Sequence, residues 1–272
     1  MRDITFGQYY PSGSITHRLD PRLKILLVAT YITMVFYVPD FWGYGIVAFF
    51  VIVATILSKV PIKSVLRSIR PIIFLVAFTS IITILFYSSV DSMPDWEWWI
   101  FKIYKQSLYT AGYMACRLIL LVLGPALLTL TTTPVELTDG LEWWLSPFKL
   151  VKLPVHTLTL IMSIALRFIP TLIEETGKII NAQKARCADF DSKNIIKKAK
   201  SMLPVLIPLF VSSFRRGDEL ADALDSRCYN GAKGRTRMKQ LRFGLKDLIA
   251  FLFLAVFFVA ILNLSYHWIW IK

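Results

Sequence analysis

Five long apolar runs leave this chain few possible folds. A helix that crosses a bilayer needs about 17 to 25 apolar residues, and the runs that approach or reach this length cover residues 23–38, 41–57, 71–89, 108–133 and 248–271. The first run is the shortest, and it reaches the length of a membrane span only together with its flanking residues. The sequence therefore predicts an all-α polytopic membrane protein with about five transmembrane helices and with amphipathic helices on the cytoplasmic face.

The composition agrees with this class and argues against a soluble protein. Of the 272 residues, 56% are hydrophobic, and the mean hydropathy is +0.56. A net charge of +13 would indicate nucleic-acid binding in a soluble protein. Here the positive-inside rule for membrane proteins explains it, so we expect no nucleic-acid partner. The three cysteines have neither C-x-x-C spacing nor nearby histidines, so neither a zinc site nor a structural disulfide is expected.

The positions of lysine and arginine predict the orientation and the domains. Basic residues precede the first run and fill the connection between the second and third, whereas the first connection has none. The N-terminus is therefore expected in the cytoplasm and the C-terminus outside the cell. Residues 1–133 hold the N-terminal transmembrane helices, residues 134–247 form a cytoplasmic coupling region with two long helices, and residues 248–272 form the C-terminal transmembrane helix. The predicted location is the cell membrane.

Local signals predict where two helices begin. Asp20 is a good N-cap, and Pro21 suits the first helical position after it. Thr133 and Glu136 have the spacing of a capping box. A new helix is therefore expected directly after the fourth apolar run.

The cytoplasmic region contains a shorter apolar run, at residues 153–166. Its 14 uncharged residues are few for a membrane span. We expect this run to lie near the membrane surface and to end at Arg167 and Pro170.

Two arginines of the coupling region have the same placement, 41 positions apart. Helical spacing predicts a helix over residues 171–188 that ends near Arg186, and one over residues 204–229 that ends near Arg227. Each arginine continues the apolar side of its helix. The residues of these sides are Ile179, Ala182 and Gln183 in the first helix, and Leu220, Ala223 and Leu224 in the second.

Such arginines have two interpretations. The planar guanidinium suits a pocket of carboxylates and carbonyls in a partner protein, or it reaches lipid phosphates. Arg227 has no acidic residue three or four positions away, whereas Arg186 has Asp189. On the charged face of the second helix, Arg215 is expected to pair with the acidic residues three and four positions further on. The repetition of the pattern favours a partner protein slightly.

Four stretches resemble the transmembrane T component of energy-coupling factor transporters, which are vitamin and metal-ion importers powered by ATP-binding cassette subunits. The first is "GSITHRLDPRLK" near the N-terminus. In the coupling region, "ALRFIPTLIEETGKIINAQKAR" and the more specific "LPVLIPLFVSSFRRGDELADALDSRCY" are similar to the stretches that end in the family's two signatures. The tail "GAKGRTRMKQL" is most similar to the shared type, which serves several substrate-binding subunits.

The resemblance implies that both arginines bind ATPases. In the family, each of two coupling helices ends in an Ala-Arg-Gly signature whose arginine docks on one ATPase subunit. The matching residues here are Ala185, Arg186 and Cys187, and Ser226, Arg227 and Cys228. This chain departs from the family by cysteine at both third positions, by Ser226 in place of alanine, and by Gly217 where alanine is usual.

The implied partners are two ABC ATPase subunits, a small substrate-binding membrane subunit (the S component) and the lipid bilayer. No G-x-x-x-x-G-K-[ST] loop occurs in the chain, so ATP and magnesium are expected in the ATPases. We expect no cofactor, no metal and no catalytic residue in this chain. Arg117 lies inside the fourth run without a nearby acid, and backbone carbonyls or a partner subunit are its expected contacts.

Three functions follow from these features. The first, which the resemblance implies, is that of a coupling subunit that transmits ATPase motion to a substrate-binding subunit for uptake of vitamins or other micronutrients. Alternatively, the chain is a conventional ABC importer permease that forms its own translocation path. The third possibility is a membrane scaffold whose two arginines bind anionic lipid by charge alone, so that lysine would replace them without loss.

Overall fold

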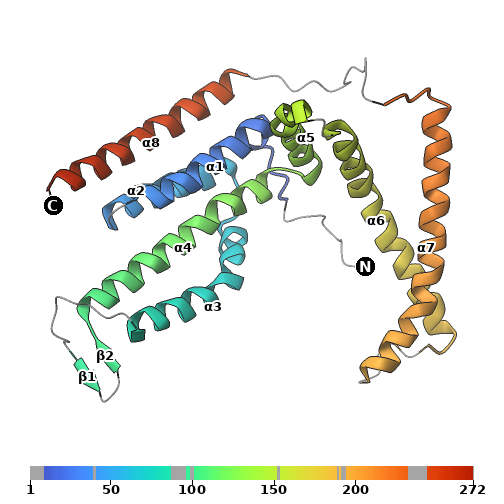
Figure 1. Cartoon of the computed structure of the whole chain (residues 1–272), viewed down its shortest axis with the longest axis horizontal. Helices are drawn as coiled ribbons and strands as arrows, with labels where there is room; N and C mark the ends of the chain where they lie inside the picture. Colours follow the sequence, from blue (N-terminus) through green and yellow to red (C-terminus); the bar gives the residue numbers. More distant parts are fainter. Residues whose placement is uncertain are drawn as a thin grey trace. The chain divides into compact units, whose positions relative to one another are not determined.

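The computed structural model is almost entirely helical in the residues that it describes, which are 9–38, 41–86, 96–98, 101–151, 154–188, 190, 194–231 and 244–271 (Figure 1). The helices are α1 (Pro21–Tyr37), α2 (Phe41–Ser58), α3 (Ile62–Phe86), α4 (Lys105–Thr131), α5 (Pro134–Leu145), α6 (Val155–Ala185), α7 (Ile195–Asp225) and α8 (Leu245–Ile271), with the 3-10 turns η1 (Thr16–Arg18) and η2 (Ser146–Val151). The all-α class is confirmed. A small antiparallel hairpin, β1 (Trp96–Trp98) with β2 (Phe101–Ile103), is the unexpected addition.

The chain folds into two compact units. The first, which we call the membrane bundle, comprises Gly7–Trp144 and Gln240–Lys272 and contains α1 to α4, nearly all of α5, and α8. The second, which we call the α6–α7 unit, comprises Met1–Phe6 and Leu145–Lys239. The division of the chain by membrane side, at residues 133 and 247, stays a prediction.

Five described helices are long and apolar enough to cross a membrane, namely Phe41–Ser58, Ile62–Phe86, Lys105–Thr131, Val155–Ala185 and Leu245–Asn263. Four of them match predicted spans. The first predicted span corresponds to α1, whose 17 residues lie at the lower limit for crossing and which packs against α4 and α8. The fifth is α6, so the surface location of its apolar run stays a prediction.

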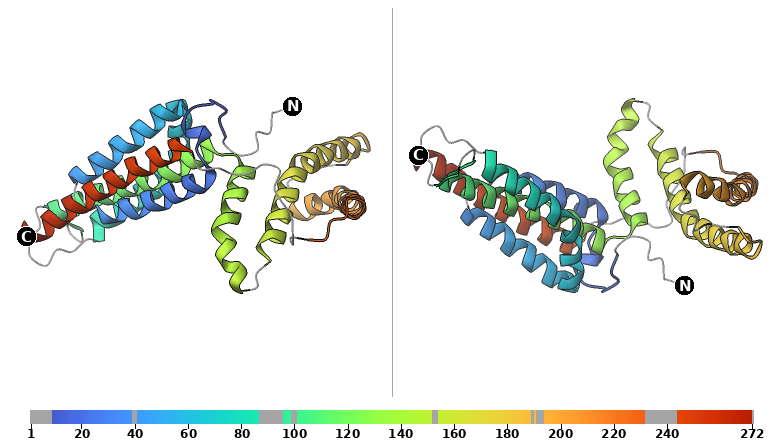
Figure 2. Two further views of the ribbon diagram at one scale, coloured as in Figure 1. Left: turned by 90° about the horizontal axis from the view of Figure 1, so that it is seen from above. Right: turned by 90° about the horizontal axis from the view of Figure 1, so that it is seen from below.

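Aliphatic and aromatic side chains fill the membrane bundle, in which α1, α2, α4 and α8 run side by side (Figure 2). Met34 and Val47 are completely buried. At the centre, the Tyr31 hydroxyl donates to the Leu120 carbonyl over 2.6 Å. The ring of Tyr31 lies so close to α4 that a Cβ on Gly124 would be 2.4 Å from it. Only glycine lets these two helices approach in this way.

Polar contacts close one end of the bundle and account for the motif "GSITHRLDPRLK". As predicted, Asp20 caps α1 by accepting from the Arg22 amide over 2.9 Å, with Pro21 as the first helical residue. The backbone amide of Asp20 donates to Asp247 Oδ1 at the start of α8 over 2.9 Å. The buried Lys24 Nζ donates to the Thr131 carbonyl at the end of α4 over 3.1 Å. The motif therefore joins the ends of three helices.

Two further predictions of helix ends had different outcomes. The capping box is confirmed, because the Thr133 amide donates to Glu136 Oε2 and the Glu136 amide donates to Thr133 Oγ1, each over 3.3 Å. The predicted end of the short run at Arg167 and Pro170 is wrong, since α6 continues through both to Ala185. A proline removes one backbone hydrogen bond, but leaving several backbone groups unpaired in apolar surroundings costs more.

Helix α7 also begins earlier than predicted, at Ile195 instead of residue 204. The side chain of Asn194 caps it by accepting from the Ile196 amide over 3.1 Å. Pro204 and Pro208 lie inside the helix. The basic residues Lys197, Lys198 and Lys200 therefore lie in the first turns of α7.

Candidate functional site

The first candidate docking residues lie where α6 ends, in a tight hydrogen-bonded turn. The Cys187 amide donates to the Lys184 carbonyl and the Ala188 amide to the Gln183 carbonyl, each over 3.0 Å. Cys187 has a φ of 62°, which is the left-handed region. This pair of bonds with a left-handed residue is the Schellman motif, which satisfies the last carbonyls of a helix.

Helix α7 ends in the same motif. The Cys228 amide donates to the Asp225 carbonyl over 2.9 Å, and the Tyr229 amide donates to the Leu224 carbonyl over 3.0 Å. Cys228 has a φ of 55°. Cysteine thus occupies the left-handed position that glycine usually takes, at both ends. Both helix ends therefore form the Schellman turn with cysteine at the left-handed position.

The arginine of each motif immediately precedes the left-handed cysteine. Arg186 and Arg227 are both exposed. Among the described residues, neither guanidinium has a hydrogen bond or an ion pair. The predicted neighbour of Arg186, Asp189, lies outside the described residues. Both arginines are therefore presented to the surroundings with their donors free within the described part of the chain.

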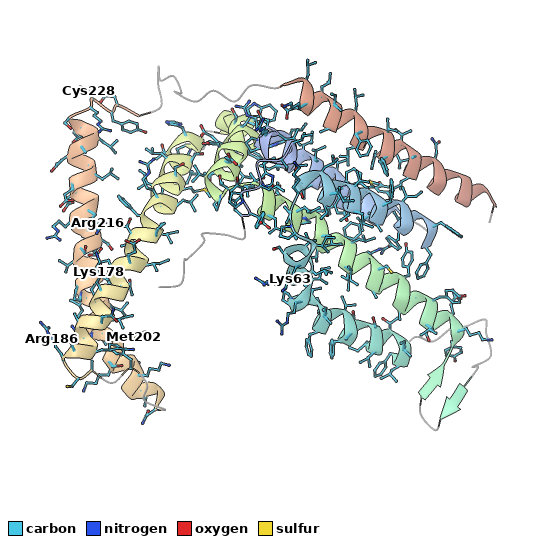
Figure 3. All side chains as sticks on the ribbon, turned by 180° about the vertical axis from the view of Figure 1, so that it is seen from behind. Lys63, Lys178, Arg186, Met202, Arg216 and Cys228 are labelled. Atoms are coloured by element: carbon cyan, nitrogen blue, oxygen red, sulfur yellow. The ribbon has the colours of Figure 1, made fainter. Side chains whose placement is uncertain are left out.

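The two arginines belong to two separate sites. Figure 3 labels Arg186 at one end of the α6–α7 unit and Cys228, the neighbour of Arg227, at the other. The reason is that the two helices pack against each other and α7, with its 31 residues, spans about 46 Å at 1.5 Å per residue. The residues of each signature, 185–187 and 226–228, lie together at one helix end, but the two signatures lie apart from each other.

The residues predicted to pack beside the arginines line the last turns of α6 and α7. They are half-buried or exposed, and none is fully buried. The half-buried ones are Ile179, Gln183, Leu220 and Leu224, and the exposed ones are Ala182 and Ala223. Each helix end therefore offers a partly apolar surface next to its arginine.

A polar cluster that joins α6 to α7 was not predicted from the sequence. Glu175 Oε2 pairs with Arg216 Nη2 over 2.7 Å, and Ser212 Oγ donates to Glu175 Oε1 over 2.5 Å. The predicted pairing of Arg215 with the acidic residues of its own helix is wrong, because Arg215 has no ion pair with any described residue. Sequence spacing within one helix favours such local pairs and gives no signal for a partner on another helix.

The intramembrane arginine of the bundle has partners other than those predicted. Arg117 donates from Nε to the Tyr44 hydroxyl and from Nη2 to the Tyr113 hydroxyl, each over 2.8 Å. Its guanidinium also lies over the Tyr113 ring, 4.8 Å from the centroid, and attraction to the ring adds to these bonds. Tyrosine hydroxyls therefore take the place of the expected carbonyls, and the contacts need no partner subunit.

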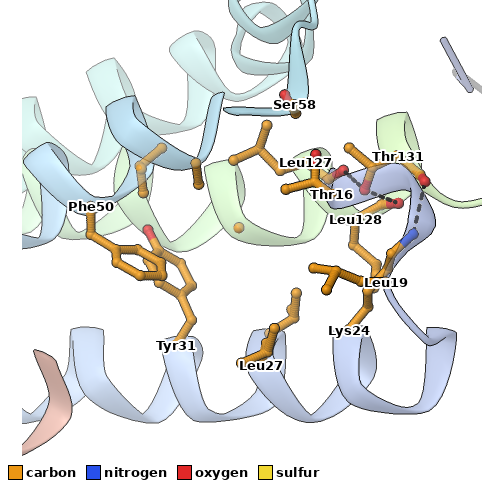
Figure 4. A pocket seen from close by; sticks show the side chains of 14 residues that line it. Thr16, Leu19, Lys24, Leu27, Tyr31, Phe50, Ser58, Leu127, Leu128 and Thr131 are labelled. Carbon is orange, nitrogen blue, oxygen red and sulfur yellow. Dashed lines mark hydrogen bonds between the residues drawn. The ribbon is translucent and has the colours of Figure 1, made fainter. Parts of the chain in front are cut away.

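The bundle also contains a partly open apolar cavity of about 120 Å³ between α1, α2 and α4 (Figure 4). Its walls are mostly aliphatic and aromatic, with Leu27, Tyr31, Phe50 and Leu127 among them. Among the described residues, no group of three or more His, Cys, Asp or Glu side chains could hold a metal ion. The cavity is therefore mainly an apolar space, and the polar residues of its lining are Thr16, Lys24, Ser58 and Thr131.

Comparison with known proteins places the chain in a family. Residues 12–239 match the model of the family CbiQ, described as a cobalt transport protein. Three curated relatives carry the name energy-coupling factor transporter transmembrane protein EcfT. They come from Ruminiclostridium cellulolyticum (47% identical over 266 residues, 98% of each chain), Clostridium kluyveri (47% over 268 residues, 98% of each chain) and Thermosediminibacter oceani (45% over 270 residues, 99% of this chain and 100% of the relative). The chain belongs to the EcfT family.

Membership of the EcfT family confirms the resemblance found in the sequence. It identifies a multi-pass membrane subunit of an energy-coupling factor transporter. It also supports the coupling function over that of a conventional permease that forms its own path. The two helix ends and the cluster between them are thus features of an EcfT chain.

Proposed function

We propose that this chain is the coupling subunit of an energy-coupling factor importer and that it docks one ABC ATPase at Arg186 and another at Arg227. The observation that carries the proposal is the pair of matched helix ends. Each end has a Schellman turn, a left-handed cysteine and an exposed arginine. The two ends point to two equivalent recognition surfaces, as a pair of similar ATPase subunits would provide.

The turn explains why arginine suits this position. A Schellman turn satisfies the last carbonyls of the helix with backbone amides, so the guanidinium is not needed as a cap. Arginine presents five donors in a planar fork and is weakly hydrated compared with lysine. Inserted into a groove of carboxylates and carbonyls, it forms several bonds in one geometry. Force can then pass through the contact without rotation of the side chain.

The polar cluster between the helices supports transmission of motion. Glu175 contacts both Ser212 and Arg216 and so links α6 to α7. When two bound ATPases close, a linked pair responds as one body, whereas two independent helices would each follow their own ATPase. The cluster is therefore a positioning element that holds the spacing between the two arginines.

Helix α7 carries the surface that we assign to the substrate-binding subunit. Large apolar side chains are exposed along it, and Phe214 is 73% exposed. Contiguous exposed apolar surface marks interaction with a protein or a membrane. The residues of this surface, which we call the α7 apolar face, are Leu203, Leu206, Ile207, Phe210, Val211 and Phe214.

The remaining parts of the proposal concern chemistry and orientation. ATP and magnesium bind in the ATPase partners, and this chain contributes no catalytic group to hydrolysis. The transported substrate is a vitamin or another micronutrient, held by the S component. The N-terminus lies in the cytoplasm and the C-terminus outside, as the distribution of basic residues indicates.

Co-purification from the native host tests this function. The chain is tagged, extracted in mild detergent and analysed for the proteins that accompany it. We expect two ABC ATPase chains, or two copies of one, together with at least one small hydrophobic subunit. Recovery of the chain with lipid alone would contradict the coupling function and favour a membrane scaffold.

A further inference from the structure

A second hollow of the membrane bundle is lined by basic residues from three distant parts of the sequence. Its volume is about 310 Å³. Arg18 comes from η1, Lys59 follows the end of α2, and Lys246 lies in the first turn of α8. We call this hollow the basic pocket. Its other lining residues are Gly13, Ser14, Ile15, Ile56 and Leu57.

No acidic residue lines the basic pocket. Among the described residues, none of its three cationic groups has a hydrogen bond or an ion pair. Two acids are close to these residues in the sequence. Asp247 accepts from the Asp20 and Gly244 amides, and Asp20 accepts from the Arg22 amide, so each carboxylate already has a backbone partner. Three like charges around one hollow repel one another, and an anion between them removes that repulsion. The charge distribution therefore favours an anionic ligand.

The backbone at Lys59 gives an independent indication of function. The backbone of this residue has a φ of 52°, in the left-handed region that residues other than glycine rarely adopt. Glycine or asparagine is usual at such a helix end. An unfavourable backbone conformation at a residue that lines a pocket suggests that the Lys59 side chain has a function in that pocket. A lysine without an ion pair among the described residues can bind an anion.

The position of the pocket matches the phosphate layer of a bilayer. The membrane-compatible helix α2 ends at Ser58, directly before Lys59, and the membrane-compatible part of α8 begins at Leu245, directly before Lys246. Both lysines thus lie where apolar helices leave the hydrocarbon. At the rim, Ile56 is 67% exposed, which suits contact with acyl chains. Ile15 and Leu57 add further exposed apolar surface there.

We infer that the basic pocket binds the headgroup of an anionic phospholipid. The phosphate lies between Arg18, Lys59 and Lys246, and the acyl chains lie against the exposed apolar rim. Basic pockets at the cytoplasmic ends of membrane helices bind such headgroups in other proteins. A bound lipid would join the N-terminal turn to α2 and α8. This inference depends on insertion of the bundle in a membrane and is independent of ATPase docking.

The test compares lipids of different charge on the full-length chain. The chain is purified in mild detergent and titrated with phosphatidylglycerol or phosphatidylcholine of identical acyl chains, and bound lipid is counted by native mass spectrometry. We expect one phosphatidylglycerol to bind in preference to phosphatidylcholine. The combined variant Arg18→Gln, Lys59→Gln and Lys246→Gln should weaken phosphatidylglycerol binding about a hundredfold, since each basic residue near an anionic surface contributes about fivefold.

A matched control removes the same charge elsewhere. The variant Lys63→Gln, Arg67→Gln and Arg70→Gln neutralises three exposed residues of α3 that do not line the pocket. We expect it to keep the affinity for phosphatidylglycerol within about threefold, because these residues do not line the pocket and exposed charges are screened by salt. Equal loss in both triple variants would overturn the inference in favour of diffuse surface charge. Equal binding of the two lipids would also overturn it.

Two further measurements separate folding and free phosphate from lipid binding. Lys59→Gly removes one charge while placing glycine in the left-handed turn, so it should fold at least as well and still bind phosphatidylglycerol about fivefold more weakly. Unchanged lipid affinity in this well-folded variant would count against the pocket. Inorganic phosphate should displace the lipid only weakly. Displacement by phosphate at lipid-like concentrations would assign the pocket to the free ion instead.

Discussion

The membrane bundle and the α6–α7 unit bury their apolar residues to very different extents. The largest fully buried side chains of the described residues all belong to the bundle, with Met34, Val35 and Ile261 among them. In the described part of the α6–α7 unit, the buried residues are Val155, Thr159, Val205 and Ser212. At the same time, Phe210 and Phe214 of that unit are exposed.

This difference shows how one chain divides its apolar residues between stability and binding. The bundle has a large core that forms inside the chain, although α3 and other helices of the bundle also expose apolar side chains. The α6–α7 unit has few buried residues, links its two helices through Glu175, Ser212 and Arg216, and exposes large apolar side chains along α7. Exposed apolar surface of this kind is stable only when lipid or a partner covers it. The two proposed ATPase-docking sites therefore lie in the unit with the smaller core.

The largest effect is expected from Arg227→Glu in the α6–α7 unit. The reversed charge should weaken ATPase association at least about thirtyfold, which corresponds to about 2 kcal/mol for a desolvated charge contact. Co-purified ATPase measures the loss, and the amount of chain in the membrane fraction should not change. Arg215→Glu is the matched control, because Arg215 is exposed on the same helix without an ion pair among described residues. Equal loss in both variants would remove the special role of Arg227.

Arg227→Lys refines that experiment. A groove that recognises a planar fork should lose most of its affinity, whereas lipid phosphates accept lysine equally well. Full ATPase association with lysine at this position would therefore contradict recognition by a specific groove.

The next effect, in the membrane bundle, is expected from Gly124→Ala. The new methyl group would collide with the Tyr31 ring, and overpacking of this kind costs about 1–3 kcal/mol. The thermal unfolding midpoint of the purified chain in detergent should fall. Gly45→Ala in α2 is the control, since a Cβ there meets nothing within 4 Å. An equal decrease in both variants would show that helix packing at Tyr31 is not the cause.

A smaller effect of opposite sign is expected from Gly217→Ala in the α6–α7 unit. Close packing does not require this glycine, because a Cβ would meet nothing within 4 Å. Alanine should stabilise α7 by about 1 kcal/mol, since glycine in a helix interior is unfavourable by that amount. Hydrogen exchange of the α7 amides should slow. Faster exchange would indicate that flexibility at Gly217 is built into the unit.

The smallest effect is expected from the polar cluster. A double-mutant cycle of Glu175→Gln and Arg216→Gln should give a coupling of about 0.5–1 kcal/mol, as is usual for partly exposed pairs. Hydrogen exchange in α6 and α7 should accelerate, while exchange in the bundle stays unchanged. Glu174→Gln, at an exposed neighbouring position, controls for charge. A coupling of zero would mean that the cluster does not hold the two helices together.

Local sequence signals predicted the features that depend on neighbouring residues. The N-cap at Asp20 and the capping box at Thr133 are both confirmed, because a cap requires only residues two or three positions apart. The positions of Arg186 and Arg227 near helix ends are confirmed for the same reason. The roles of both arginines in docking stay predictions.

Features that depend on distant residues were missed. Arg117 contacts Tyr44, 73 positions away, and Arg216 contacts Glu175, 41 positions away. Sequence spacing along one helix gives no signal for either pair. The prediction that a helix ends at Pro170 was also wrong. A proline removes one backbone hydrogen bond, but keeping the other backbone groups paired in apolar surroundings outweighs that loss.

The sequence by itself determined that this chain is a helical membrane protein of the EcfT family with two similar arginine-bearing helix ends. Hydropathy and helical periodicity are properties of consecutive residues, so they can be read from the sequence without the tertiary structure. Only the tertiary structure decided that the two ends lie apart, that α6 and α7 are joined through Glu175, and that Arg18, Lys59 and Lys246 surround one hollow. Such contacts arise when packing brings distant helices together, and the chain encodes them only through the whole fold.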